Sequence, residues 1–262
     1  MYKLKEKVSE AILLEESIIE NFKYTVRFAK TEVDVESAMR LRFDVFNLEL
    51  GEGLASSYES GMDTDKYDRQ CHHLIVIENE TGKTIGTYRM QSSIEARNVD
   101  GFYTGEEFEI EKFPDEILNN AVELGRACIH KDHRNGRVLF LLWRGLAKYL
   151  QYRGMRFLFG CCSLTSQDPL EGLKVEKYLR ENNFYHPDYF IGTKQGYRCE
   201  VDHVPEIDIS ELKLPHLFRL YLDLGTKVCS GPALDRTFQT IDYLILLDIE
   251  NVSDQTKTLF FR

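Results

Sequence analysis

The residues most suggestive of chemistry lie in segment 123–139, where a predicted strand, a tight turn and the start of a helix follow one another. We expect the strand at 122–129, the turn at 130–136 and the helix from about Arg137. The first turn of a helix presents free backbone N–H groups and the positive end of the helix dipole, which together attract phosphate groups. The corner is therefore either a site for a pyrophosphate or phosphopantetheine phosphate, or an ordinary turn that binds nothing.

Basic side chains are concentrated around this corner, although the chain as a whole is acidic. Residues 130–156 contain seven Lys and Arg residues and one acid, a charge of +6 in a chain of net charge −10. Arg137, Arg144 and Lys148 are seven and four residues apart, so they form one stripe along the predicted helix. The stripe is either a solvated helix face or a docking surface for an acidic partner, such as an acyl carrier protein with its phosphopantetheine arm. The full basic set is Lys131, Arg134, Arg137, Arg144, Lys148, Arg153 and Arg156.

A second group of charged residues comes earlier in the chain. Arg42 and Phe46 are one turn apart on a helix that we expect at 33–46, so their side chains face the same side. Phe46 on its own would be read as a core residue. An arginine on that side needs an anionic partner, for which Asp65, Asp68 or the carboxylate of a substrate are candidates. The two aspartates are either solvated or helix-capping acids, or together a site for a cation.

Composition limits the class of protein. The length of 262 residues suits one large or two small domains, and a hydrophobic fraction of 43% supplies an ordinary core. The net charge of −10 argues against general binding of nucleic acid, which requires a basic footprint. No stretch approaches the roughly 18 apolar residues that span a bilayer, and we find no signal peptide. The six cysteines are scattered without a CxxC pair, so we expect a cytoplasmic protein with reduced thiols and no metal site.

The elements that must position these residues follow from hydrophobic periodicity. Residues 1–23 are expected to hold an amphipathic helix, which packs on the domain, lies on a membrane surface or forms a dimer. No linker divides residues 24–262, so we expect a single α/β domain built on a mixed sheet. The predicted strands are 24–29, 73–78, 84–91, 122–129, 157–163 and 243–249, and the predicted helices are 33–46, 114–119, 137–153, 173–182 and 215–224.

Several short motifs occur in a specific order along the chain. Residues 41–46 read LRFDVF, 65–68 DKYD, 71–74 CHHL, 86–89 GTYR and 123–126 ELGR. In this order they resemble the GNAT-type acyltransferases, and within them the branch that takes acyl groups from acyl carrier protein. That branch includes the acyl-homoserine-lactone synthases and the ornithine or glycine N-acyltransferases of lipid synthesis, some of which are called hemolysin-like. The later segments LPHL, YLDLG, GPALD and FQTID, at 214–217, 221–225, 231–235 and 238–242, are similar to the lipid-synthesis branch.

The resemblance implies a fold and an activity. The fold would be of GNAT type, a mixed and mostly antiparallel central sheet flanked by helices. The activity would be transfer of a 3-hydroxyacyl or other acyl chain from acyl carrier protein to the α-amine of an amino acid, ornithine first and glycine next. It implies no tightly bound cofactor, with acyl carrier protein or acyl-CoA as donor substrate, and contact with the membrane periphery. The alternatives are an acyl-homoserine-lactone synthase and a non-catalytic protein that binds acyl carrier protein.

The resemblance also implies roles for individual residues. Glu123 would take the proton of the attacking amine, with Arg126 beside it; the alternative is a structural ion pair of Glu123 with Arg126 or Arg89. Arg89 would clamp the carboxylate of the acceptor, and Asp65 with Asp68 would bind a cationic acceptor such as ornithine. Arg42 and Phe46 complete the expected acceptor site. We expect His72, His73, Asp235 and Asp242 to be structural.

The expected donor site surrounds the corner described first. Backbone N–H groups near 127–129 would stabilise the oxyanion, and Cys128, Arg134, Gly136 and Arg137 would surround the phosphopantetheine. Lys131, Arg144 and Lys148 would dock the carrier protein. The usual RxxGxG or RxxGxA phosphate loop is altered, because Gly136 comes one position early and Leu139 stands at the last position. This change favours a carrier-bound donor over coenzyme A.

Overall fold

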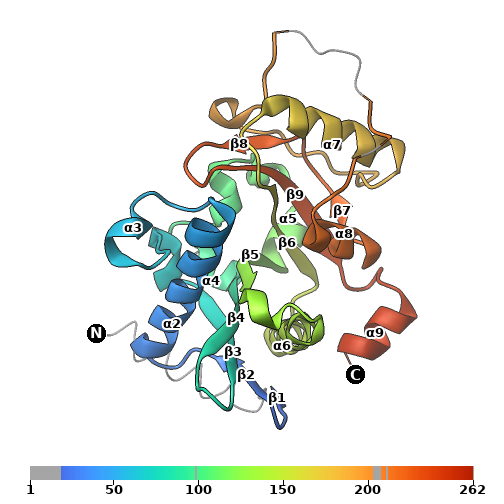
Figure 1. Ribbon diagram of the computed structural model, residues 1–262. Helices are drawn as coiled ribbons and strands as arrows, with labels where there is room; N and C mark the ends of the chain where they lie inside the picture. Colours follow the sequence, from blue (N-terminus) through green and yellow to red (C-terminus); the bar gives the residue numbers. More distant parts are fainter. Residues whose placement is uncertain (1–18, 98, 203–207, 211, 262) are drawn as a thin grey trace.

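A computed structural model describes residues 19–97, 99–202, 208–210 and 212–261 (Figure 1). Most of the helix expected at residues 1–23 lies outside the described residues. Its last part does not continue a helix, because β1 (Ile19–Glu20) pairs antiparallel with β2 (Tyr24–Phe28). The described chain therefore begins at the edge of the sheet.

The strands of the described chain form one nine-stranded sheet in the order β1-β2-β3-β4-β5-β6-β9-β7, with β8 paired to β9. Only β5 and β6 run parallel, so the sheet is mixed and mostly antiparallel, as predicted. A turn at 79–82 joins the two antiparallel strands β3 and β4. The remaining strands are β3 (His72–Glu78), β4 (Thr84–Ser92), β5 (Ala121–Ile129), β6 (Phe157–Leu164), β7 (Lys227–Val228), β8 (Ala233–Asp235) and β9 (Thr240–Asp248).

Helices pack on both faces of this sheet. Helix α6 coincides with its prediction because glycines in the left-handed region, Gly136 at φ 79° and Gly154 at φ 64°, flank it. The helix expected at 33–46 ends as an α-helix at Phe43 and continues as a π-helical turn, Asp44–Leu50. The helices are α2 (Glu32–Phe43), α3 (Ser57–Ser60), α4 (Ser93–Arg97), α5 (Asp115–Asn119), α6 (Arg137–Arg153), α7 (Pro169–Glu181), α8 (His216–Asp223) and α9 (Asp254–Phe260).

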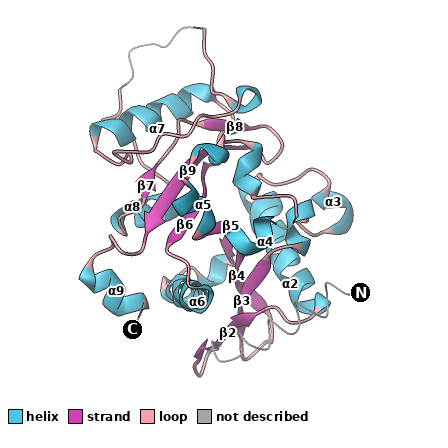
Figure 2. Cartoon of the chain, turned by 180° about the vertical axis from the view of Figure 1, so that it is seen from behind, coloured by secondary structure: helices cyan, strands magenta, loops and turns pink. Residues whose placement is uncertain are grey.

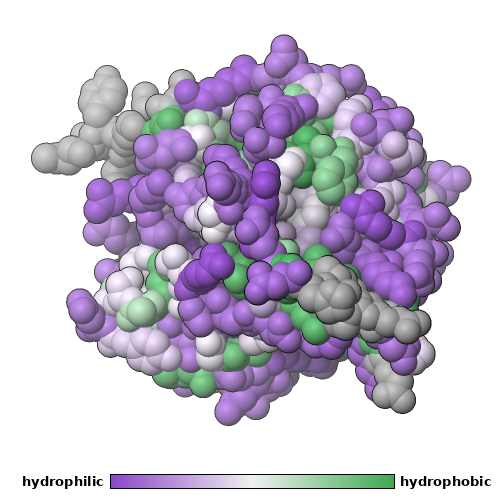
Figure 3. All heavy atoms as spheres, turned by 90° about the horizontal axis from the view of Figure 1, so that it is seen from above, coloured by the Kyte–Doolittle hydropathy of each residue, from purple (hydrophilic) through white to green (hydrophobic). Residues whose placement is uncertain are grey.

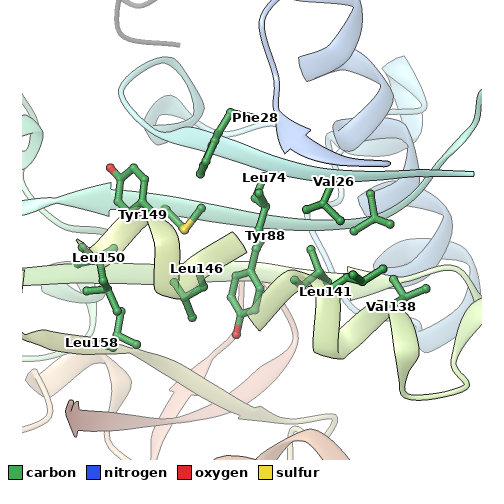
Figure 4. Close-up of a cluster of buried hydrophobic side chains, with 14 of the residues drawn as sticks. Val26, Phe28, Leu74, Tyr88, Val138, Leu141, Leu146, Tyr149, Leu150 and Leu158 are labelled. Carbon is green, nitrogen blue, oxygen red and sulfur yellow. The ribbon is translucent and has the colours of Figure 1, made fainter. Parts of the chain in front are cut away.

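The two faces of β4 separate the core from the charged residues. Because successive side chains of a strand point to opposite faces, Tyr88 joins the apolar cluster under α6, whereas the neighbouring Arg89 forms ion pairs on the other face. Figure 4 shows side chains of β2, β3 and β4 facing those of α6 in this cluster. Gly145 allows α6 to approach β3, since a Cβ at this position would collide with Leu74. α2 contacts β3, β4 and β5.

The parallel pairing of β5 with β6 is short, and the two strands part beyond it. Only Ala121–Glu123 pair with Phe157–Phe159. Beyond that point β6 stays paired with β9 as far as Leu164, while β5 remains paired with β4. The two strands therefore diverge, and an opening forms between them near Leu124 and Gly160.

α6 and α7 lie at opposite ends of the molecule in both ribbon views (Figures 1 and 2). The face in Figure 3 is mostly hydrophilic, with small separate hydrophobic patches. Among the described residues, no helix is both long and apolar enough to cross a bilayer. All six cysteines are free thiols, as expected.

Candidate active site

A cavity of about 560 Å³ occupies the opening between β5 and β6. Its size falls in the range of small-molecule sites. Apolar side chains from both strands, from α6 and from α8 dominate its lining, so it can hold a hydrocarbon chain. Representative lining residues are Leu124, Leu142, Leu146, Leu158, Leu217 and Phe218.

The predicted donor residues lie at this cavity, with one exception. Cys128, Arg134 and Gly136 contribute to its lining, whereas Arg137 is exposed and is not among the lining residues. Arg134 is already engaged, because its two terminal nitrogens donate to the carboxylate of Glu49 at 2.5 and 2.8 Å. This hydrogen bond holds the pKa of Glu49 below its ordinary value. A phosphate at this corner would therefore compete with Glu49 for Arg134.

The basic residues around α6 divide into two groups. Arg134, Arg153 and Arg156 form ion pairs with carboxylates. The other four form no ion pair with any residue that the structure describes. They comprise the three predicted docking residues and the first residue of α6, namely Lys131, Arg144, Lys148 and Arg137. The described part of the chain therefore does not neutralise the basic stripe.

Arg42 forms the centre of a buried ion network. Its Nε donates to Asp63 and its Nη1 to Asp68, each at 2.7 Å, with the arginine side chain fully buried. Arg89 Nη1 lies 2.6 Å from Asp65 and 3.0 Å from Asp68. Burial alone would raise the pKa of Asp68, but Arg42 and Arg89 hold it well below its ordinary value. Asp68 is therefore ionised and is neutralised from within the protein.

This network decides between the interpretations of the two predicted aspartates. Asp65 also caps a 3₁₀ turn, Lys66–Arg69, by accepting from the Tyr67 N–H at 2.8 Å. Asp68 is one of the partners predicted for Arg42, and Asp63 was not predicted. Since arginines of the protein already occupy Asp65 and Asp68, these residues offer no ready site for a cationic acceptor.

Arg126 is the member of the network that reaches the cavity. Its guanidinium carbon lies 4.2 Å from the ring centre of Phe238 and 4.8 Å from that of Tyr103. Its Nη2 is 3.1 Å from Asp65 and its Nε is 3.2 Å from Asp63, which leaves Nη1 without an ion pair among the described residues. The backbone of Arg126 has φ 53°, a conformation that is strained for a residue with a side chain. It forms a β-bulge with Ala127, because the pairing of β5 with β4 shifts there.

Glu123 makes contacts that were not predicted. One carboxylate oxygen accepts from the Thr104 N–H at 2.7 Å and from its hydroxyl at 2.8 Å, and the other accepts from the Tyr103 N–H at 2.9 Å. It pairs with neither Arg126 nor Arg89. Burial raises its pKa, and the hydrogen bonds from Thr104 oppose that rise. Glu123 lines a pocket of about 10 Å³ beside Arg89 and is not among the lining residues of the large cavity.

Phe46, which was predicted for the acceptor site, and the two histidines are all buried. Phe46 is buried, lines the cavity and packs edge-on against Phe238 with ring centres 5.4 Å apart. His73 is buried and bonds the Asp68 carbonyl, and His72 contacts the hydroxyl of Tyr149. The histidines therefore have structural contacts, as expected.

A second group of side chains at the cavity includes Asp242, which was expected to be structural, and Glu107, which sequence reasoning missed. Asp242 and Cys161 line the cavity, and the buried Glu107 lies beside them, with one ligand atom of each within 4.8 Å of the others. Burial raises the pKa of Asp242 to about 6 and that of Glu107 well above its ordinary value. These residues come from distant segments, and their spacing gives no signal in the sequence.

Comparison with known proteins places the chain in a family. Residues 41–144 match the family model of the acetyltransferase (GNAT) domain. An L-ornithine Nα-acyltransferase of Rhizobium meliloti is 30% identical over 244 residues, which cover 87% of this chain and 80% of that protein. The chain belongs to the L-ornithine Nα-acyltransferase family.

Further relatives agree with this membership. An acyltransferase of the same name from Rhodobacter capsulatus is 27% identical over 247 residues, covering 91% of this chain and 95% of that protein. FeeM, an N-acyl amino acid synthase from uncultured soil microbes, has the same fold, with a TM-score of 0.50 at 8% identity over 87% of this chain and 92% of the other. The predicted GNAT fold is therefore confirmed, and the protein is an acyltransferase.

Proposed function

We propose that this acyltransferase moves an acyl chain from the thioester of acyl carrier protein to the α-amine of ornithine. The observation that carries the proposal is the apolar cavity between β5 and β6, with Arg126 in its wall and the start of α6 at its rim. The names of four relatives with 27–30% identity support ornithine as the acceptor. The reaction forms an N–C bond and breaks the C–S bond, and the thiol leaves with a proton.

The cavity would hold the acyl chain of the donor. Each methylene removed from water contributes about 0.8 kcal/mol, so apolar walls supply affinity without specific contacts. The thioester would lie at the bulge of β5, where irregular pairing leaves backbone N–H groups to stabilise the oxyanion. Cys128 and Gly136 would flank the pantetheine arm, and Arg137 would meet its phosphate.

The acceptor carboxylate would bind Arg126. This side chain lines the cavity, and the rings of Tyr103 and Phe238 hold its plane in place. Both Arg126 and the predicted clamp, Arg89, pair with aspartates, but only Arg126 is among the residues that line the cavity. We therefore assign Arg89 and Arg42 to positioning the network that supports Arg126.

The attacking amine must lose a proton, and the predicted base was Glu123. Its oxygens accept hydrogen bonds from Tyr103 and Thr104, and it is not among the residues that line the cavity, whereas Tyr103 is. We propose that Glu123 is a positioning residue that holds Tyr103 against Arg126. A chain of water molecules would then carry the proton away.

Four cations at α6 that pair with no acid of the described chain favour acyl carrier protein over coenzyme A as the donor. They extend from the 3₁₀ turn Lys131–His133 along one face of the helix, so a partner could meet them together. Complementary charge speeds encounter and sets orientation. The product would be a lipid precursor, so we also propose release at the cytoplasmic face of a membrane.

The purified protein tests this proposal directly. It would be incubated with 3-hydroxyacyl carrier protein or 3-hydroxyacyl-CoA, each with ornithine, glycine or S-adenosylmethionine, and the products weighed by mass spectrometry. We expect acylornithine from the carrier-bound donor. Acyl-homoserine lactone as the product would establish the signal-synthase alternative. Acylation of nothing by folded protein that binds the carrier would establish the non-catalytic alternative.

A further inference from the structure

Two buried carboxyl groups at the cavity face each other without a cation. Glu107 is 1% exposed and Asp242 is 3% exposed. Oε2 of Glu107 and Oδ1 of Asp242 have no hydrogen-bond donor among the described residues, apart from a proton that the two carboxyl groups can share. Neither residue forms an ion pair with the described part of the chain. This sets them apart from Asp63, Asp65 and Asp68, which arginines neutralise.

A third carboxylate adds to the negative charge. Asp235 accepts from two backbone N–H groups at 2.7 and 2.9 Å and from the hydroxyl of Tyr103 at 3.3 Å. It is therefore satisfied, and it repels charge on its two neighbours. Carboxylates that are buried away from water repel each other unless a proton or a cation lies between them. The raised pKa of Asp242 and of Glu107, caused first by burial, reflects this condition.

The position of the carboxyl pair relates it to Arg126. Tyr103 has Arg126 stacked on its ring and Asp235 bonded to its hydroxyl, so one tyrosine side chain separates the anionic cluster from the guanidinium. Arg126, Tyr103 and Asp242 all line the same cavity. An amino acid whose carboxylate meets Arg126 could therefore extend a short cationic side chain toward Asp242.

We propose that Glu107 and Asp242 form the subsite for the side-chain ammonium group of the acceptor, a proposal that rests on the proposed function. The ammonium group would take the place of the proton that the two carboxyl groups share, which leaves to solvent, and would donate to both carboxylates. Because this amine stays charged and held away from the thioester, acylation would go to the α-amine. The site takes the place of Asp65 and Asp68, the predicted cation site, which have no room for a further charge.

Comparison of acceptors tests the subsite. Ornithine and norvaline share a carbon skeleton, but norvaline lacks the terminal amine. We expect Glu107→Gln and Asp242→Asn each to raise KM for ornithine at least tenfold and to change KM for norvaline less than threefold. We also expect Nδ-acylornithine to appear beside the Nα product. Asp248→Asn is the control, because Asp248 lies on the same strand but pairs with Arg156.

The outcomes separate this inference from the proposed function. If wild-type protein does not acylate ornithine, the proposed function fails and the subsite with it. If the wild type acylates ornithine and the folded variants keep its preference over norvaline, only the subsite is overturned. Should a variant not fold, the wild type decides alone: a preference for ornithine over norvaline of less than threefold would overturn the subsite.

A metal ion is the other cation that three such side chains could hold. Wild-type protein dialysed against EDTA distinguishes the two sources of charge. We expect the ratio of kcat/KM for ornithine to that for norvaline to be unchanged. Loss of the ratio, with recovery on adding a divalent metal, would overturn the ammonium subsite.

Discussion

Gly160 packs directly against the carbonyl oxygen of Leu124, at the point where β5 and β6 part. No side chain fits there, because a Cβ on Gly160 would collide with that backbone oxygen. The close approach holds the paired ends of the strands together while their other ends diverge around the cavity. This contact therefore links the short parallel pair to the space for the acyl chain.

Gly160→Ala should damage both the fold and the donor site. The new methyl group must push β6 from β5, at a cost of about 1–3 kcal/mol typical of overpacking, and the cavity should change shape. We expect a lower urea midpoint and a higher KM for the acyl donor. Gly196→Ala is the control, since nothing lies within 4 Å of its Cβ and its stability should change by less than about 0.5 kcal/mol. Equal midpoints for the two variants would contradict this reading.

Asp68→Asn should be among the most destabilising changes in the protein. It removes the shared buried carboxylate of Arg42 and Arg89, and breaking such a pair costs about 3–5 kcal/mol. Asp223→Asn in the exposed pair with Arg219 should cost less than about 1 kcal/mol. Urea denaturation of both variants measures the difference, and similar losses would show that the network is not structural.

Asp242→Asn should change the dependence of stability on pH. Burial raises the pKa of Asp242 to about 6, against about 3.9 in an unfolded chain. The folded state thus binds the proton more tightly, so this stabilisation is present below about pH 4 and is lost as pH rises through 6. The variant, which cannot ionise, should gain on the order of 2 kcal/mol over wild type between pH 4.5 and 8.

Chemical denaturation at the two pH values measures this gain. Asp248→Asn provides the contrast, because hydrogen bonding to Arg156 lowers the pKa of Asp248 despite burial. The Asp248→Asn variant should be no more stable than wild type at pH 8. If the difference in free energy of unfolding between Asp242→Asn and wild type is the same at pH 4.5 and at pH 8, the pKa of Asp242 is not raised.

Arg126→Lys should weaken binding of the acceptor while leaving the fold intact. Lysine keeps the charge, but it lacks the planar group that lies against Tyr103 and Phe238 and that can pair with Asp63, Asp65 and a substrate carboxylate through different nitrogens. We expect kcat/KM for ornithine to fall at least tenfold, mainly through KM. The exposed Arg40→Lys serves as the control. An unchanged KM would remove Arg126 from the acceptor site.

Charge reversal on α6 should separate the two possible donors. Replacing Arg137, Arg144 and Lys148 with Glu is expected to raise KM for acyl carrier protein more than tenfold and to flatten its salt dependence. KM for acyl-pantetheine, which has neither phosphate nor protein, should not change. Lys174→Glu with Lys177→Glu, on α7, is the control for added negative charge. If the α6 variant retains the wild-type KM, the docking face is excluded.

The sequence by itself determined the local structure around the site. The period of apolar residues predicted α6 with its observed bounds, and short apolar, β-rich runs located β3, β4, β5 and β6. These signals are local, since capping and periodicity depend on neighbours along the chain. The motif order likewise indicated the GNAT fold and the acyltransferase activity. The short strands β7 and β8 and the helix α9 were missed, because each is too brief to show a period.

Only the tertiary structure decided which charges meet. The sequence offered Asp65 and Asp68 for a cationic acceptor, but the fold gives them to Arg42 and Arg89. It offered Glu123 as a base, but the loop at 103–104 takes up its oxygens. Glu107 and Asp242, which no motif joined, lie side by side at one wall of the cavity because β9 and the 103–107 segment converge there. Two charged side chains form an ion pair when they lie close together in space. In this sheet, the order of the strands brings together segments that are far apart in the chain, so sequence spacing does not show which charges meet.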